Sequence, residues 1–196
     1  MKNWIEKEQP KESTLQSLKK DLKIDAFICS LLLQRQVNSL KKAQKFFRPD
    51  IDLLHDPFLM RDMKKVVEKI QNSKEHRIMI LGDYDVDGTT STAMLYKYFN
   101  NMDYDLLYYI PDRYEEGYGV SEKAIDYAEI NKVSLIITVD CGIKAVNQVD
   151  LSNSKNIDVI ICDHHLPGEQ IPNAFGILNP KQENCNYPFK ELCGCA

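Results

Sequence analysis

Hydrophobic and polar positions follow two different patterns along the chain, and the change comes near residue 77. Before it, apolar side chains recur at the spacing of one helix face. N-cap residues and prolines bound the helices expected there, over residues 25–35, 39–47 and 57–70. We therefore expect residues 1–76 to form a helical segment that packs on the following domain.

Beyond this point, short runs that are apolar throughout alternate with segments of helical spacing. Five of the runs have the length of strands: residues 77–81, 106–110, 134–139, 157–162 and 174–178. Helices are expected between them, over residues 90–100, 121–131 and 143–153. Strands that are apolar on both faces and alternate with helices indicate a parallel sheet that is covered on both sides. The sequence thus predicts an α/β domain over residues 77–196, with a parallel β-sheet and helices on both faces.

Acidic and imidazole side chains follow three of these expected strands: Asp83, Asp85 and Asp87; Asp140; and Asp163, His164 and His165. Ligands of open parallel sheets gather beyond the carboxyl ends of the strands, so these groups are expected to meet at one edge. Carboxylates together with imidazoles suit manganese or magnesium, and a shared carboxylate would bridge two ions about 3.5–4 Å apart. Clustered aspartates also repel one another unless a cation or protons neutralise them.

Composition and charge fit a globular protein with an uneven charge distribution. Hydrophobic residues make up 43% of the chain and charged residues 28%, which excludes a wholly disordered chain. Residues 1–77 carry a net charge of +6 and residues 78–196 a net charge of −10. The basic part would suit a nucleic acid, although solvated helix faces explain it more simply. No membrane-length apolar run and no signal peptide are found, so we expect a cytoplasmic protein without membrane association.

The cysteines leave a metal site open as a minor alternative. Three of the six, Cys185, Cys193 and Cys195, lie close together near residue 196 and raise the question of zinc. No C-x-x-C pair is present and no fourth ligand is nearby in the sequence, so reduced, unpaired thiols are the favoured interpretation.

A second motif competes for the first cluster. Asp85-Val-Asp87-Gly-Thr89 fits the D-x-D-x-T signature of haloacid-dehalogenase-like phosphatases, in which the first Asp is a covalent nucleophile. In that family the strand runs directly into the nucleophile, whereas three residues intervene here. The alternative also gives no role to Asp140 or to Asp163-His164-His165, so we do not favour it.

Three motifs together resemble the DHH phosphoesterase superfamily: Gly82-Asp-Tyr-Asp-Val-Asp-Gly88, Thr138-Val-Asp-Cys-Gly142 and Asp163-His-His-Leu-Pro167. The particular form resembles the RecJ-type branch, the bacterial single-strand-specific DNA exonucleases. Supporting segments are Leu54–Met60, Ile110–Gly119 and Leu178–Pro180. The similarity extends over nearly the whole chain from about residue 25. It implies metal-dependent phosphodiester hydrolysis from the 5′ end of single-stranded DNA, in DNA repair and recombination.

The resemblance also implies a role for each matching residue. Asp85 would bind the first of two manganese (or magnesium) ions. Asp87 and His164 would bind the second ion, and Asp140 would bridge the two. His165 would contact the scissile phosphate or assist protonation, and Asp83 would orient a ligand or water from outside the ligand set. Arg113 would recognise a terminal phosphate through its bidentate guanidinium. Its alternative is a surface arginine beside two glutamates.

Two departures from the family pattern bear on activity. Leu81 stands where other branches carry a histidine, which removes one nitrogen ligand. The family's fourth motif, a further aspartate ligand, would lie beyond residue 196, as would its second catalytic domain and OB-type domain. The resemblance thus implies a truncated domain with little nuclease activity of its own. It suggests single-stranded DNA as partner, with a helicase or single-strand-binding protein as further partners. A phosphoesterase of short oligonucleotides or small phosphate esters, and a non-catalytic nucleic-acid-binding relative, remain alternatives.

Overall fold

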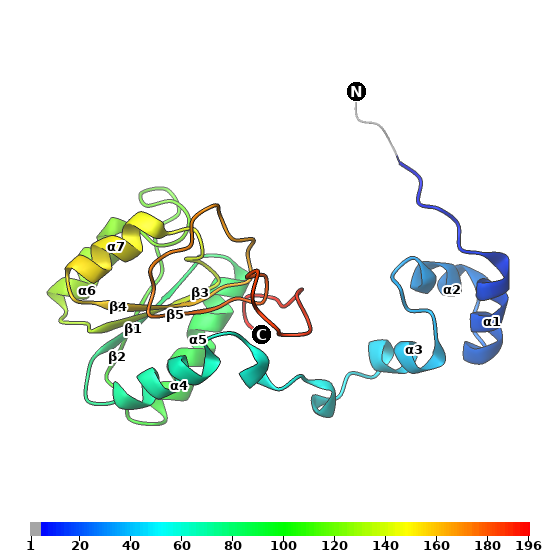
Figure 1. The fold of residues 1–196 in the computed structure, drawn as a ribbon, viewed down its shortest axis with the longest axis horizontal. Helices are drawn as coiled ribbons and strands as arrows, with labels where there is room; N and C mark the ends of the chain where they lie inside the picture. The colour runs from blue at the N-terminus through cyan, green and yellow to red at the C-terminus, as the bar shows by residue number, and fades with distance from the viewer. Residues whose placement is uncertain (1–4) are drawn as a thin grey trace. The chain divides into compact units, whose positions relative to one another are not determined.

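The computed structural model describes residues 5–196, which divide into two compact units after Leu54. Each unit has its own hydrophobic core, and Figure 1 shows the elements of both. The first unit is helical and the second is α/β. The division falls earlier in the chain than the boundary expected after residue 76, so the helix before the first strand belongs to the second unit.

The first unit consists of three short helices, α1 (Glu12–Leu22), α2 (Ala26–Leu33) and α3 (Leu40–Phe47), and a 3₁₀ turn, η1 (Ile51–Leu53). Its core is built from Leu18, Cys29, Leu32, Val37 and Ala43. The N-cap expected at Asp25 is confirmed, since its side chain accepts a hydrogen bond from the Phe27 amide at 2.8 Å. Ser39 caps α3 in the same way by accepting one from the Lys42 amide at 3.3 Å.

The second unit opens with a break that the sequence pattern does not predict. A continuous helix was expected from Pro57, but a 3₁₀ turn, η2 (Pro57–Leu59), is followed by a separate helix, α4 (Met63–Asn72). Between them Asp62 adopts a left-handed backbone with φ of 65°. Its carboxylate accepts a hydrogen bond of 3.1 Å from the amide of Ile177, far along the chain. This long-range contact accounts for the turn, and the expectation of one helix was wrong.

The expected parallel sheet is confirmed. In the described residues it has five strands, β1 (Ile78–Gly82), β2 (Leu106–Tyr109), β3 (Leu135–Val139), β4 (Asp158–Cys162) and β5 (Gly176–Leu178). Their order across the sheet is β2-β1-β3-β4-β5, and every neighbouring pair is parallel. All residues of β1 and β3 are buried, which explains why these strands are apolar at every position.

Helices cover both faces of the sheet, as expected (Figure 1). Helix α5 (Val86–Asn100) packs with α4 against the face that carries Ile78 and Ile80. Helices α6 (Glu122–Ile130) and α7 (Val146–Ser154) pack against the opposite face. None of the helices in residues 5–196 combines the length and apolar character needed to cross a bilayer.

The strand order creates one topological switch point. The neighbouring strands β1 and β3 connect in opposite directions, β1 to β2 on one side and β3 to β4 on the other, so the loops after β1 and β3 part from each other. Doubly wound sheets of this order bind ligands in the crevice at that point, beyond the carboxyl ends of the strands. A ligand site is therefore expected among the residues that follow β1 and β3, with those after β4 next to them.

Candidate metal centre

Side chains from the three predicted segments meet at this edge of the sheet. Oxygen atoms of Asp83, Asp85 and Asp140 lie within 4.8 Å of one another, and so do ligand atoms of Asp140, His164 and His165. Asp140 is common to both groups. The carboxyl ends of β1, β3 and β4 thus bring together five of the residues expected from the sequence.

The loop after β1 is shaped by the start of α5. Asp85 is the N-cap of that helix and accepts a hydrogen bond from the Gly88 amide at 3.0 Å, which keeps the pKa of its carboxyl below the usual range. Gly88 lies so close to the backbone of Asp83 that a Cβ at this position would collide with it. Asp83 itself is 1% exposed, and burial raises the pKa of its carboxyl.

Asp140 is held in a conformation that few residues other than glycine adopt. Its φ is 61°, in the left-handed region, and its amide donates to the Cys162 carbonyl at 2.9 Å. The side chain is 1% exposed, and burial together with the nearby Asp85 carboxylate raises the pKa of Asp140 to about 7. A buried, strained carboxylate that resists ionisation is typical of a functional site.

His164 turns one ring nitrogen toward Asp140 and the other toward a backbone carbonyl. Its Nδ1 lies 2.7 Å from the carbonyl oxygen of Leu192, and because a carbonyl only accepts, Nδ1 is the donor of this contact. The other nitrogen, Nε2, lies 3.1 Å from Oδ1 of Asp140. At this distance Nε2 and Oδ1 can serve as two ligands of one cation that lies beside them. A histidine ligand that donates its second N–H to a carbonyl is the usual arrangement in metal sites.

His165 is oriented by its neighbour Asp163. Oδ1 of Asp163 accepts hydrogen bonds from the amides of His164 and His165 and from Nδ1 of His165, at 2.7, 3.0 and 2.7 Å. Its Oδ2 accepts from the amide of Ile143 in the loop after β3, at 2.9 Å. Asp163 therefore connects the loops after β3 and β4 and orients the His165 ring, whose Nε2 lies 3.5 Å from the hydroxyl of Tyr118.

Two contributors, Tyr118 and Asn179, were not assigned a role from the sequence, and Asp163 has a role beyond the one expected. Asp163 belongs to the recognised motif, but its organising role depends on the amide of Ile143, twenty residues away. Tyr118 donates to the carbonyl of Asp140 at 3.1 Å and places its ring edge-on to His165. Asn179 is fully buried and donates to the carbonyl of His165 at 2.9 Å. The glycine-flanked position of Tyr118 was the only sequence signal for its part.

Two of the expected site residues lie apart from this group. Asp87 accepts a hydrogen bond from the Gly194 amide at 2.7 Å, and its carboxylate clusters with the thiols of Cys193 and Cys195. Arg113 is exposed and stacks over the ring of Tyr84, with 5.4 Å from its guanidinium carbon to the ring centroid. Tyr84 stands between Asp83 and Asp85, so Arg113 borders the metal-ligating loop without contacting its carboxylates.

The residues present fit a pair of hard divalent cations. Within residues 5–196, Oδ1 of Asp83 and Oδ1 of Asp140 are buried without a hydrogen-bond donor, and such orphaned oxygens need an explanation. His164 reaches Asp140 Oδ1 in distance but not in hydrogen-bond geometry. Oxygen donors with imidazole match the preference of manganese. We conclude that this edge has the donor set of a metal centre.

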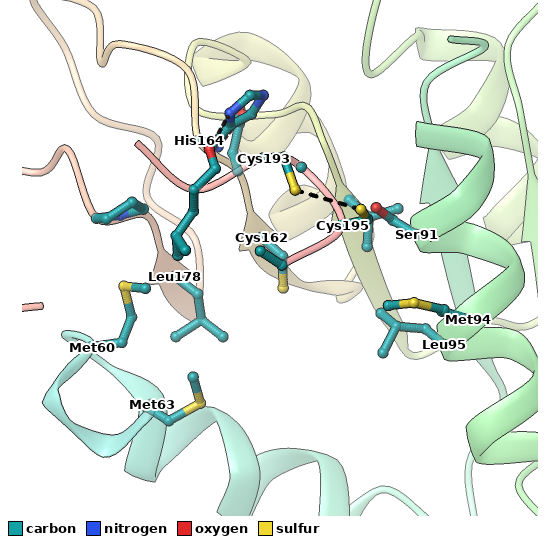
Figure 2. Close-up of a pocket in the computed structure, with 16 residues that line it drawn as sticks. Met60, Met63, Ser91, Met94, Leu95, Cys162, His164, Leu178, Cys193 and Cys195 are labelled. Atoms are coloured by element: carbon teal, nitrogen blue, oxygen red, sulfur yellow. Dashed lines mark hydrogen bonds between the residues drawn. The ribbon is translucent and has the colours of Figure 1, made fainter. Parts of the chain in front are cut away.

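Cavities open on both sides of the two histidines. One, of about 310 Å³, is lined by Tyr118, Lys144, Asp163 and His165 among others, so it carries a lysine as well as an aspartate. The other, of about 220 Å³, has a largely apolar wall that includes several methionines, and His164 and the segment Leu192–Ala196 close one side of it (Figure 2).

Comparison with known proteins identifies relatives for most of the chain. Residues 77–196 match the model of the DHH family, N-terminal domain. The single-stranded-DNA-specific exonuclease RecJ of Bacillus subtilis is 40% identical over 189 residues, which cover 95% of this chain and 24% of that protein. The chain therefore spans about a quarter of the length of this relative.

Solved structures show the same fold. A crystal structure of exonuclease RecJ bound to manganese superposes with a TM-score of 0.61 at 28% identity, covering 67% of this chain and 34% of the other. A crystal structure of RecJ from Thermus thermophilus in complex with Mn²⁺ gives a TM-score of 0.70 at 20% identity, covering 95% and 26%. The second likeness bears on the fold alone.

Proposed function

The chain belongs to the DHH family, and from this premise we propose that its metal centre serves manganese-dependent hydrolysis of phosphodiester bonds in single-stranded DNA. One observation carries the proposal: buried Asp140 shares its carboxylate between an aspartate group and a histidine group, with Nε2 of His164 3.1 Å away. A shared carboxylate of this kind is what two neighbouring cations require.

We assign the ligand roles as follows. Asp85 would hold the first cation and His164 the second, and Asp140 would bridge the two cations. Asp83 would direct its buried oxygen toward the first cation. Asp87 would complete the second site by turning away from Gly194, which it now contacts. When bound, the two cations supply Lewis acidity toward a phosphoryl group and lower the pKa of a water.

The protein's own groups position the substrate and move the proton. His165, with Nδ1 held by Asp163 at 2.7 Å, offers Nε2 to a phosphate oxygen or to the leaving hydroxyl. The cavity that His165 shares with Lys144 would accept a phosphate of the strand. Arg113, steadied on Tyr84, would contact the terminal phosphate, as its bidentate geometry allows.

The substrate and context follow from the relatives. The Bacillus subtilis protein is a single-stranded-DNA-specific exonuclease, and we extend this activity to the protein to which the present chain contributes. Degradation from 5′ to 3′, a place in DNA repair and recombination, a helicase or single-strand-binding protein as partner, and a cytoplasmic location remain parts of the proposal that rest on resemblance.

The test is a chimera in which this chain replaces the matching 189-residue segment of the Bacillus subtilis relative. We expect the chimera to degrade single-stranded DNA in the presence of manganese and to spare duplexes. The same chimera with Asp140→Asn should lose at least about a hundredfold in rate, because both cations lose a ligand. Circular dichroism of each chimera checks that it is folded.

Other outcomes favour the alternatives. A folded chimera that cleaves dinucleotides but not long single strands would indicate a phosphoesterase of short oligonucleotides. One that binds single-stranded DNA without cleaving it, at any manganese concentration, would indicate a non-catalytic relative. For the 196-residue chain alone we predict only weak nuclease activity in the same assay; a rate equal to that of the chimera would contradict this.

A further inference from the structure

Two thiols and a carboxylate form a second cluster beside the metal centre. Cys193 and Cys195 flank Gly194, and their Sγ atoms lie 3.6 Å apart (Figure 2). The carboxylate of Asp87, at the first turn of α5, completes a group whose three ligand atoms lie within 4.8 Å of one another. These residues come from segments far apart in the chain, so the sequence alone did not connect them.

The turn that presents the thiols is anchored on three sides. The Gly194 amide donates to Oδ2 of Asp87 at 2.7 Å, and the Leu192 carbonyl accepts from Nδ1 of His164 at 2.7 Å. Gly194 also packs so closely on Asp140 that a Cβ would collide with its Oδ1. The positions of the two thiols are thus set by these backbone contacts together with the hydrogen bond between the two sulfurs.

The distance between the sulfurs matches that of two ligands on one ion. Two thiolates bound to zinc at about 2.3 Å with a tetrahedral angle lie about 3.8 Å apart, close to the observed 3.6 Å. A disulfide would require about 2.05 Å. We propose that Asp87, Cys193 and Cys195 form a distinct binding site for a thiophilic divalent cation, with zinc as the natural ligand.

The chemistry of the cluster separates it from the neighbouring centre. Thiolates are soft donors that select zinc, whereas the oxygen and imidazole donors around Asp140 suit manganese. The side chain of Cys193 is exposed and that of Cys195 is half-buried, so water can take a fourth position on the ion. Cys185 is not a member, because its Sγ lies against Sδ of Met60 at 3.6 Å.

Asp87 belongs both to the zinc site proposed here and, if the proposed function is correct, to the second manganese site. A zinc ion that binds Asp87 would withhold this carboxylate from the second manganese. Zinc should therefore weaken manganese binding, while zinc binding itself needs only the three residues of the cluster.

Cobalt(II) titration of the reduced 196-residue chain tests the site, because thiolate ligation of cobalt gives a sulfur-to-metal charge-transfer band in the near ultraviolet. We expect this band for the wild type and its removal by one equivalent of zinc. Cys193→Ser, Cys195→Ser and Asp87→Asn should each weaken cobalt and zinc affinity by at least about tenfold. The control Cys185→Ala changes a thiol outside the cluster and should keep the full band.

The outcomes are distinguishable from those of the manganese centre. Asp140→Asn should retain the charge-transfer band even though it loses manganese, since it removes no ligand of the cluster. Circular dichroism shows whether each variant is folded. The absence of a thiolate band in the reduced, folded wild type would overturn the proposal, and so would equal bands in the wild type and the Cys193→Ser/Cys195→Ser double variant.

Discussion

Asp140 is the residue on which the proposed metal centre depends. Burial and the Asp85 carboxylate raise its pKa to about 7, and its left-handed φ of 61° aims the side chain at the point where the loops after β1, β3 and β4 meet. Without a cation the site relieves its charge by holding a proton on this carboxyl group. Metal and proton therefore compete for Asp140.

This competition predicts a pH dependence of manganese binding. Because the pKa of Asp140 in the metal-free protein is raised, the carboxyl group is protonated below about pH 7, and binding must displace that proton. We expect the affinity to rise about tenfold per pH unit up to about pH 7 and then to level off. Calorimetry in two buffers of different ionisation enthalpy should show release of about one proton at about pH 6 and much less at about pH 8. Equal proton release at both values would contradict the assignment.

Individual residues show what the sequence can and cannot predict about the site. Acids and imidazoles at strand ends correctly predicted that Asp83, Asp85, Asp140, His164 and His165 meet, because parallel strands place their carboxyl ends at one edge. The pattern did not predict that Asp163 joins two loops, or that Asp87 contacts Gly194. These contacts depend on loop conformations that have no periodic signal.

At the scale of elements, one glutamate fixes the connection between β2 and α6. Glu116 accepts hydrogen bonds from the hydroxyl of Tyr109 at 2.9 Å, from the amide of Asp112 at 3.0 Å and from the hydroxyl of Ser121. Burial acts to raise its pKa, but these donors outweigh burial and lower it. The connection carries Arg113 and Tyr118, so Glu116 supports the substrate side of the site.

Replacing this glutamate should loosen the connection. Glu116→Gln keeps the shape but removes the charge, and we expect a loss of about 1 kcal/mol in the free energy of unfolding at about pH 7. The pKa of Glu116 is lower in the folded than in the unfolded protein, so its ionised carboxylate stabilises the fold above the unfolded-state pKa. This stabilisation is lost as the pH falls through the folded-state pKa. The difference from the wild type should therefore shrink as the pH falls below about 4.5. Urea unfolding at several pH values measures this.

The matched control is Glu115→Gln. Its carboxylate is exposed and pairs only with Lys123, at 3.1 Å, among the residues that the structure describes. This substitution should change stability by less than about 0.5 kcal/mol. Equal losses for the two variants would show that the hydrogen bonds of Glu116 do not hold the connection.

Element boundaries show where periodicity stops being informative. Strands β1 and β3 were predicted within a residue, because a fully buried strand has no polar position. Helix α5 starts at Val86, earlier than the expected residue 90, because Asp85 is its N-cap. The break at Asp62 depends on the amide of Ile177. The residues at which these helices begin are therefore determined by single hydrogen bonds and not by the spacing of hydrophobic residues.

At the scale of the whole molecule, the site lies entirely within one of two units. Every ligand candidate belongs to residues 55–196, whereas helices α1 to α3 form a separate core around Leu18 and Cys29. Manganese that binds the second unit stabilises that unit against any opening that would separate the metal ligands. We expect no such effect on the first unit, which supplies no ligand. The sheet and its switch point were predictable from the alternation of strands and helices, but the place where the chain divides was not.

Hydrogen exchange tests this division. On addition of manganese we expect slower exchange for amides at the carboxyl ends of β1, β3 and β4, since opening these segments would break ligand contacts. Amides of α1, α2 and α3 should exchange at unchanged rates. Protection of the helical unit equal to that of the sheet would mean that the ion acts on both units.

If Asp140 holds the proposed metal centre together, its loss must weaken manganese binding, which calorimetric titration of the chain measures. We predict that Asp140→Asn weakens binding at least about tenfold, as expected for the loss of a shared ligand. Asp126→Asn, which removes an exposed carboxylate paired with Lys155, should bind like the wild type. Equal manganese affinity of the wild type and Asp140→Asn at about pH 8, where the wild-type carboxyl group is ionised, would contradict the claim.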